Sequence, residues 1–277
     1  MAVVEVYELH KRYDGVVAVH DVSFSVERGE IFGIVGPDSA GKTTVVECIE
    51  GVRRRDGGEI SVLGLDPRHD RVRLRQRLGA QLQNCALPDR LRVIESLQLF
   101  ASFYPDPADP SELVERLGLT EQRDTAFGAL TAGQQKRLSI AVALVGRPEI
   151  VVFDELTSGL DPQIRREIWE WIRQLRDSGV TVLMATSLME EAERLCSRLA
   201  LLDAGRVVAV DTPAGLVTRA HLERASLLAH EGIVAAGSRR EQGDLEDAFR
   251  ALTGRPRGTD DNEFVGTDIA DPAREAP

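Results

Sequence analysis

The chain has 277 residues, of which 43% are hydrophobic and 29% are charged, and its formal net charge is −11. This length and apolar content suit one large α/β domain or two small ones, and the acidic balance argues against a general nucleic-acid-binding surface. We expect no membrane-spanning segment, because no apolar run approaches about 18 residues, and no signal peptide at the N-terminus.

The first third of the chain predicts strands around one helix. Residues 2–35 alternate apolar and polar side chains, which is typical of strands and hairpins, with breaks at Asp14-Gly15 and Arg28-Gly29. The run from Ile31 to Val35 is wholly apolar, and a helical pattern follows over residues 42–52. A short strand is then expected over residues 59–63.

The middle of the chain predicts helices and then buried strands. The Arg-rich segment 69–78 favours a solvated helix face, and residues 84–148 follow a helical pattern. Strands are expected at 149–154 and 180–186. Between them lies a predicted helix whose two tryptophans, Trp169 and Trp171, we expect to be buried or half-buried.

The last part predicts one more hairpin and a tail. The segment LALLDAGRVVAV is expected to turn at Ala204-Gly205, and the composition from Gly254 onwards predicts disorder. The three cysteines, Cys48, Cys85 and Cys196, are far apart in sequence. They indicate reduced cytosolic thiols without metal-ligand spacing.

A glycine-rich loop joins the apolar strand to the helix after it. Residues 36–43 read GPDSAGKT, a Walker A sequence, and the strand-loop-helix order lets backbone N–H groups and the helix N-terminus face one anion. In such a loop Lys42 reaches the β- and γ-phosphates of a nucleotide, and the Thr43 hydroxyl ligates Mg²⁺. A chance glycine turn is the alternative.

A second carboxylate motif follows about a hundred residues later. Four apolar residues, 150–153, precede Asp154-Glu155, which is a Walker B arrangement. Asp154 is expected to hold Mg²⁺ through water, and Glu155 to orient the attacking water or accept its proton. Taken alone this pattern is weak, and it gains weight from the phosphate loop before it.

The segment LTAGQQKR, residues 130–137, predicts a helix start between these motifs. Thr131 can cap the helix and Gln134 lies three residues later, as in a capping box. A capped helix needs no further explanation. The functional alternative is that this N-terminus offers N–H groups and a partial positive charge to an anion.

Together these motifs resemble, in order and over about residues 5–215, the nucleotide-binding subunit of an ABC transporter. The resemblance implies an α/β fold of the P-loop NTPase, ABC ATPase type: a mixed-sheet core with N-terminal antiparallel strands and an inserted helical subdomain at about 84–148. Tyr13 matches the aromatic residue that stacks on adenine, and Gln83 matches the Q-loop glutamine that senses Mg²⁺. LTAGQ matches the signature LSGGQ, and 158–161 match the D-loop.

The resemblance assigns ATP and Mg²⁺ as cofactors and names the residues that serve them. The catalytic candidates are Glu155, Gln83 and Ser187. The metal candidates are Thr43, Gln83 and Asp154. The nucleotide-binding candidates are Tyr13, Gly36, Pro37, Asp38, Ser39, Ala40, Gly41, Lys42, Thr43, Thr44, Thr131, Gly133, Gln134 and Asp161.

Within the family, the sequence is similar to the daunorubicin-resistance ATPase branch of drug exporters. MEEAERLCSRLALLDAGRVVAVDTPAGL fits that branch, and LEDAFRALTGR at 245–255 resembles its C-terminal signature. We therefore expect an ATPase domain at 1–215, a shortened C-terminal region at 216–254 and a disordered tail at 255–277.

The sequence departs from the family at the site itself. Ser187 occupies the position of the switch histidine, and Asp38 and Ser39 replace the usual Asn and Gly of Walker A. Thr131, Ala132 and Leu156 are milder replacements. Losing one donor to the transition state costs roughly 10²–10³ in rate, so we expect ATP binding to be kept and hydrolysis to be slow. The alternative is that a water or a neighbouring side chain replaces the histidine.

ABC subunits work as head-to-tail pairs, so the resemblance implies a homodimer or a heterodimer with another ABC ATPase. It also implies a separate transmembrane permease subunit, a cytoplasmic location on the inner face of the membrane, and no nucleic acid. The first functional hypothesis is an exporter ATPase. A non-transport ABC protein usually carries two ATPase domains or a long coiled-coil insertion, and neither is seen in this sequence. The third hypothesis is a hydrolysis-poor structural or regulatory subunit, motivated by Ser187 and Asp38.

Overall fold

The computed structural model describes residues 1–81, 87–230 and 244–254 of the chain. The expected Q-loop glutamine, Gln83, and the tail at 255–277 lie outside the described residues, as does Cys85. Among the described residues no helix combines the length and the apolarity needed to span a membrane.

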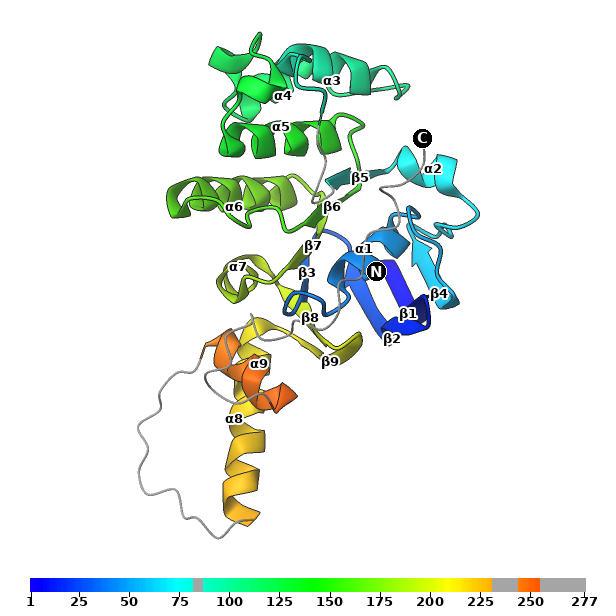
Figure 1. Cartoon of the computed structure of the whole chain (residues 1–277), viewed down its shortest axis with the longest axis vertical. Helices are drawn as coiled ribbons and strands as arrows, with labels where there is room; N and C mark the ends of the chain where they lie inside the picture. Colours follow the sequence, from blue (N-terminus) through cyan, green and yellow to red (C-terminus); the bar gives the residue numbers. More distant parts are fainter. Residues whose placement is uncertain (82–86, 231–243, 255–277) are drawn as a thin grey trace.

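Two β-sheets and their covering helices make up the fold (Figure 1). The strands are β1 (Ala2–Tyr13), β2 (Val16–Glu27), β3 (Ile31–Val35), β4 (Gly57–Val62), β5 (Leu78–Gln81), β6 (Ile150–Asp154), β7 (Thr181–Thr186), β8 (Arg198–Asp203) and β9 (Arg206–Asp211). The α-helices are α1 (Lys42–Ile49), α2 (Arg71–Arg75), α3 (Val93–Ala101), α4 (Pro110–Arg116), α5 (Ala132–Leu144), α6 (Pro162–Asp177), α7 (Met189–Leu195), α8 (Pro213–His230) and α9 (Leu245–Thr253). Two 3₁₀ turns lie at Thr120–Gln122 and Phe127–Ala129.

The larger sheet places the carboxyl ends of its central strands at one edge. Its order is β5-β6-β7-β3-β8-β9, and all neighbours are parallel except the antiparallel pair β8–β9. The smaller sheet, β2-β1-β4, is antiparallel. This mixed architecture confirms the expected P-loop NTPase fold of the ABC ATPase type.

Both faces of the large sheet are covered, and alternate side chains of its central strands pack into two different cores. In β3, Ile31 and Val35 pack into the core on the helical side, whereas Phe32 and Ile34 pack between the two sheets and α1. A strand buried on both faces reads as a continuous apolar run, which is what the sequence shows at 31–35 and 150–153.

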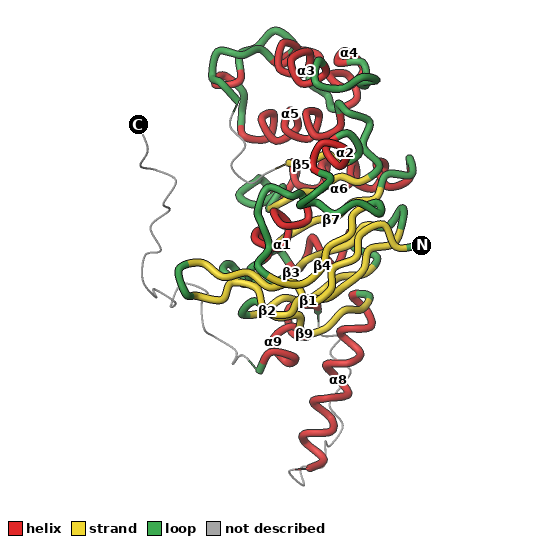
Figure 2. Tube along the Cα trace, turned by 90° about the vertical axis from the view of Figure 1, so that its right-hand side faces the viewer, coloured by secondary structure: helices red, strands yellow, loops and turns green. Residues whose placement is uncertain are grey.

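Helices α3, α4 and α5 lie between β5 and β6 in sequence and gather at one end of the molecule, where α5 runs beside α6 (Figure 1). Figure 2 shows α8 projecting from the opposite end, below the two sheets. Helix α8 begins before residue 215 and continues past it, so no break in secondary structure falls at that position.

The structure corrects the prediction for residues 69–78. The helix there is only α2, and residues 78–81 form the edge strand β5, which the sequence analysis did not predict. The backbone of α5 lies against this strand, since a Cβ on Gly79 would come within 2.0 Å of the Ala143 carbonyl oxygen. Pairing with β6 and this close approach make the strand, rather than any local alternation of side chains.

Candidate ATP site

The phosphate-binding loop is shaped by left-handed backbone at two positions. Gly41 caps α1 with φ +97°, and a Cβ there would come within 2.6 Å of the Ala18 carbonyl oxygen. Ser39 adopts φ +66°, a conformation that glycine takes at no steric cost and serine rarely takes. The loop is tied to the sheet because the Gly36 N–H donates to the Thr186 carbonyl, 3.3 Å away.

Lys42 lies at the centre of a charged cluster. Its ammonium group is buried, with 5% of the side chain exposed, and donates to the Pro37 carbonyl at 3.0 Å. It also forms an ion pair with Glu155 Oε1 at 3.2 Å, and Asp38 Oδ1 lies 3.9 Å away. The Asp38 side chain is 94% exposed, so its charge lies at the mouth of the site.

Two carboxylates lie at the end of β6, Asp154 on its last residue and Glu155 directly after it. Asp154 is buried, and its Oδ1 has no hydrogen-bond donor among the described residues. Burial raises the pKa of Asp154, and a hydrogen bond from the Thr43 side chain opposes that rise. A buried carboxylate oxygen without a donor, beside a threonine hydroxyl, has the chemistry of a hard-cation ligand set and fits Mg²⁺.

Ser187 reaches the second carboxylate. It follows β7, and its hydroxyl donates to Glu155 Oε2 over 3.3 Å. Glu155 itself has φ +48°. The Glu155 carboxylate is therefore held on Oε1 by Lys42 and on Oε2 by Ser187. The three residues follow three different strands, β3, β6 and β7.

The phosphate loop and Glu155 open onto one cavity of about 330 Å³, which Asp154 and Ser187 do not line. Its lining residues come from the phosphate loop, from α1, from β2 and from the end of β6: Ala18, Asp38, Ser39, Gly41, Lys42, Thr43, Thr44 and Glu155. Ala18 was not predicted, because an alanine inside an alternating strand carries no signal of its own.

Tyr13 lies at the end of β1 and contacts the start of α1. Its hydroxyl is 3.3 Å from Thr44 Oγ1. The Arg53 guanidinium and the Lys11 ammonium lie 5.0 and 5.4 Å from its ring centroid. The half-buried ring thus stands beside the phosphate loop.

The signature residues are not part of this cavity. Thr131 and Gln134 form the predicted capping box, in which the Thr131 N–H donates to Gln134 Oε1 at 2.9 Å and the Gln134 N–H donates to Thr131 Oγ1 at 3.4 Å. Gly133 is buried against Ile164 of α6. Asp161 caps α6 through a bond from the Gln163 N–H at 2.8 Å.

Two buried acids were missed. Glu50 follows α1, and neither of its carboxylate oxygens has a hydrogen-bond donor among the described residues. Burial, reinforced by the charges of Asp154 and Glu47, raises the pKa of Glu50 to about 8. Thr43, Glu47 and Glu50 are spaced to lie on one face of a helix, and this spacing could have identified Glu50 from the sequence.

The second missed acid is Glu191 of α7. Its Oε1 accepts from the Thr157 hydroxyl at 2.5 Å and from Trp169 Nε1 at 2.9 Å. This buried network joins the segment after Glu155 to α6 and α7. It gives Trp169 a polar partner as well as a packing role.

Comparison with known proteins identifies the family to which this site belongs. The family model described as "ABC transporter" matches residues 19–158. The chain belongs to the ABC transporter family. It is an ATP-binding subunit of the ABC type, and its enzymatic class is ATPase.

The chain is similar to curated ATP-binding proteins of export and drug resistance. It is 40% identical over 223 residues to the "Nod factor export ATP-binding protein I" of Burkholderia pseudomallei (strain K96243), an alignment that covers 78% of this chain and 73% of the relative. It is 36% identical over 213 residues to the "Daunorubicin resistance ATP-binding protein DrrA2" of Streptomyces coeruleorubidus, covering 75% of this chain and 66% of the relative. The branch resemblance is thereby confirmed.

Solved structures share the fold. The ATP-binding subunit of an ABC transporter superposes with a TM-score of 0.73 at 24% identity, covering 91% of this chain and 99% of that chain. The protein cbiO1 from Clostridium perfringens, part of the ABC transporter complex cbiONQ, superposes with a TM-score of 0.69 at 25% identity, covering 84% of this chain and 97% of that one.

Proposed function

We propose that this ABC ATPase binds MgATP and hydrolyses it to drive export of a drug-like or other small molecule through a separate transmembrane permease. The observation that carries the proposal is the gathering of Lys42, Asp154, Glu155 and Ser187 at the carboxyl ends of three neighbouring strands. Export is supported by the Nod factor and daunorubicin-resistance relatives. On this proposal the subunit is cytoplasmic and attached to the inner face of the membrane by its permease.

The residues of the site divide the work of phosphoryl transfer. The phosphate loop from Gly36 to Thr44 would hold the triphosphate with its backbone N–H groups, with Lys42 turning from Glu155 to the β- and γ-phosphates. Tyr13 would stack on the adenine. Glu155 would orient the attacking water and accept its proton.

The metal candidates keep their roles in this proposal. Thr43, Asp154 and Gln83 would hold Mg²⁺, which neutralises negative charge on the β- and γ-phosphates when it is bound. The buried Asp154 oxygen without a donor supports this assignment, because an ionised oxygen in that place needs a cation or a hydrogen bond.

Ser187 contacts Glu155, whereas a histidine at this position would contact the γ-phosphate, and this difference supports slow hydrolysis. Its hydroxyl donates to Glu155 and so steadies the water-orienting carboxylate. A serine side chain is too short to replace an imidazole at the γ-phosphate. We therefore expect a chain that binds ATP normally and turns it over slowly in a site of its own.

A second candidate function is a hydrolysis-poor structural or regulatory subunit paired with an intact ABC ATPase. The exposed negative charge of Asp38 at the mouth of the site favours it, because that charge would repel a γ-phosphate. In a heterodimer, the signature of this chain would complete a site that carries the partner's own histidine.

The test is a steady-state ATPase assay on the wild type, Ser187→His, Asp38→Asn and the double variant, each alone and with a candidate permease in proteoliposomes. Ser187→His should raise kcat roughly 10-fold or more with a smaller change in KM, because the added contact belongs mainly to the transition state. Asp38→Asn should add to this gain. Ordinary wild-type turnover that Ser187→His leaves unchanged would overturn the slow-hydrolysis proposal.

A further inference from the structure

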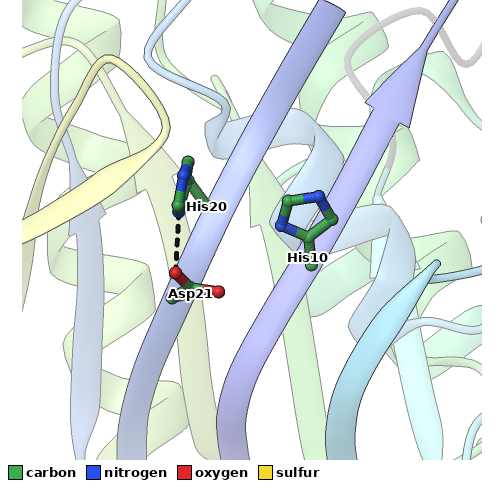
Figure 3. Close-up of side chains that lie close together, drawn as sticks. All are labelled: His10, His20 and Asp21. Atoms are coloured by element: carbon green, nitrogen blue, oxygen red, sulfur yellow. Dashed lines mark hydrogen bonds and ion pairs between the residues drawn. The ribbon is translucent and has the colours of Figure 1, made fainter. Parts of the chain in front are cut away.

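Two histidines and an aspartate meet on the outer face of the small sheet, and none of them lines the ATP cavity. His10 lies on β1, and His20 and Asp21 lie on β2 (Figure 3). One ligand atom from each of the three residues lies within 4.8 Å of the others. None of these residues has a part in the ATP site described above.

A β-bulge creates this meeting. In the β1–β2 register Leu9 pairs with Val22 and Lys11 pairs with Val19, so His20 and Asp21 together oppose the single residue His10. Within this bulge Asp21 takes a left-handed conformation, with φ +55°. Regular alternation would have placed His20 and Asp21 on opposite faces of the sheet.

The side chains already make contact in a way that suits a metal. His20 Nδ1 lies 2.8 Å from Asp21 Oδ2, and the His10 and His20 rings meet edge to face with centroids 5.6 Å apart. Two ligands that each lie about 2.1 Å from a metal are about 3.4 Å apart at the tetrahedral angle that Zn²⁺ prefers. A cation that replaces the shared hydrogen therefore needs Nδ1 and Oδ2 to move apart by roughly 0.6 Å, and a rotation of His10 completes the set.

We propose that His10, His20 and Asp21 form a binding site for a divalent transition metal of the Zn²⁺ class. Two imidazoles and one carboxylate are a zinc ligand set, and imidazoles do not select Mg²⁺ or Ca²⁺. The His20 side chain is 37% exposed and that of Asp21 56%, so the cation has access and water can fill the remaining positions.

Backbone hydrogen bonds connect the site to the phosphate loop. The His20 N–H donates to the Gly205 carbonyl at 2.7 Å, and the Gly205 N–H donates to the Ala40 carbonyl at 3.0 Å. The His10 carbonyl accepts from the Asp56 N–H at 2.9 Å. A metal would thus join β1 to β2 close to the strand end that carries Tyr13, and it would stabilise the folded state by mass action.

The test is calorimetric titration of the reduced, tag-free, nucleotide-free full chain with Zn²⁺, in millimolar Mg²⁺ to occupy the carboxylates of the ATP site. One site of micromolar affinity is expected. His10→Ala and His20→Ala should each weaken it at least 10-fold, and Asp21→Asn should weaken it less while still tolerating the left-handed backbone.

The matched control is His69→Ala, since His69 Nε2 also lies beside an aspartate, 4.0 Å from Asp66 Oδ2, but without a second histidine. It should leave the affinity unchanged. Co²⁺ should bind the wild type with a visible spectrum that lacks thiolate charge transfer, which separates this site from the cysteines. Equal Zn²⁺ affinity in the wild type and in both histidine variants, with the variants folded by circular dichroism, would overturn the proposal.

Discussion

At the carboxyl ends of β3, β6 and β7, charged side chains are buried against one another, whereas at the N-terminus of α5 neutral side chains cap one another in the open. Lys42 and Glu155 are each about 5% exposed and form an ion pair. Thr131 is exposed, and its capping box with Gln134 is complete within one helical turn.

The difference shows how each region depends on a bound ligand. The first is held together by charges that compensate each other, and a polyanion with Mg²⁺ would rearrange every one of those contacts. The second needs nothing for its own stability. The N–H groups of Ala132 and Gly133 have no acceptor within the helix, as holds for any first turn, so this end is suited to an anion, which on the proposed function is the nucleotide of a second ABC subunit.

The largest expected effect comes from breaking the charged region at Glu155. Glu155→Gln should lower ATP turnover by roughly 10²–10⁴, because it removes the proton acceptor while keeping the shape of the side chain. MgATP affinity, measured by calorimetry, should stay within a few-fold, since the phosphate loop and Lys42 remain. Glu167→Gln on the exposed face of α6 is the control. Turnover within twofold of the wild type would contradict the role of Glu155.

A smaller effect is expected from the neutral region, and it should appear only in turnover. Gly133→Asp places a negative charge where the other subunit's γ-phosphate is proposed to approach, and turnover should fall roughly 10²-fold. A carboxylate in the first turn suits the helix dipole, so the helix itself should persist. MgATP binding by the single chain should be unchanged.

Gly133→Ala is the matched steric control. A Cβ at this position meets Ile164 at 3.1 Å in both variants, so Gly133→Ala reproduces the crowding at Cβ without the carboxylate. Equal losses of turnover in the two variants would mean that crowding against α6, and not an anion, explains the effect.

A different kind of effect is expected on stability, because Glu50, buried at the end of α1, has no hydrogen-bond donor among the described residues. Glu50 has its pKa raised to about 8, so the folded protein holds a proton there that the unfolded chain releases near its ordinary value of 4.5. Stability is therefore lost as the pH rises from about 4.5 to about 8. Glu50→Gln should remove this loss.

The measurement is urea unfolding of the wild type and Glu50→Gln at pH 5, 7 and 8.5. The variant should nearly match the wild type at pH 5 and exceed it by up to about 5 kcal/mol at pH 8.5, since a rise of the pKa from 4.5 to about 8 is about 3.5 units and each unit corresponds to about 1.4 kcal/mol. Glu193→Gln, at an exposed position of α7, is the control. A stability difference that does not change with pH would show that Glu50 is not held protonated by the fold.

The sequence alone determined those features that depend on neighbours in the chain. GPDSAGKT after an apolar run predicts a strand, a phosphate loop and a helix, because glycine conformations and helix N-termini are local properties. The capping box of Thr131 and Gln134 is local in the same way, and so is the turn at Ala204-Gly205, whose residues have φ +45° and +74°. Order and type of motif were also enough to indicate the family.

Only the tertiary structure decided which distant residues meet. The edge strand β5 exists because it pairs with β6 and lies under α5, and its four residues carry no alternation of their own. Ser187 bonds to Glu155 because β7 lies beside β6, a neighbour relation that the order of motifs does not contain. His10 meets His20 and Asp21 because one bulge shifts the β1–β2 register, and register is set by long-range packing rather than by the identity of the residues that it brings together.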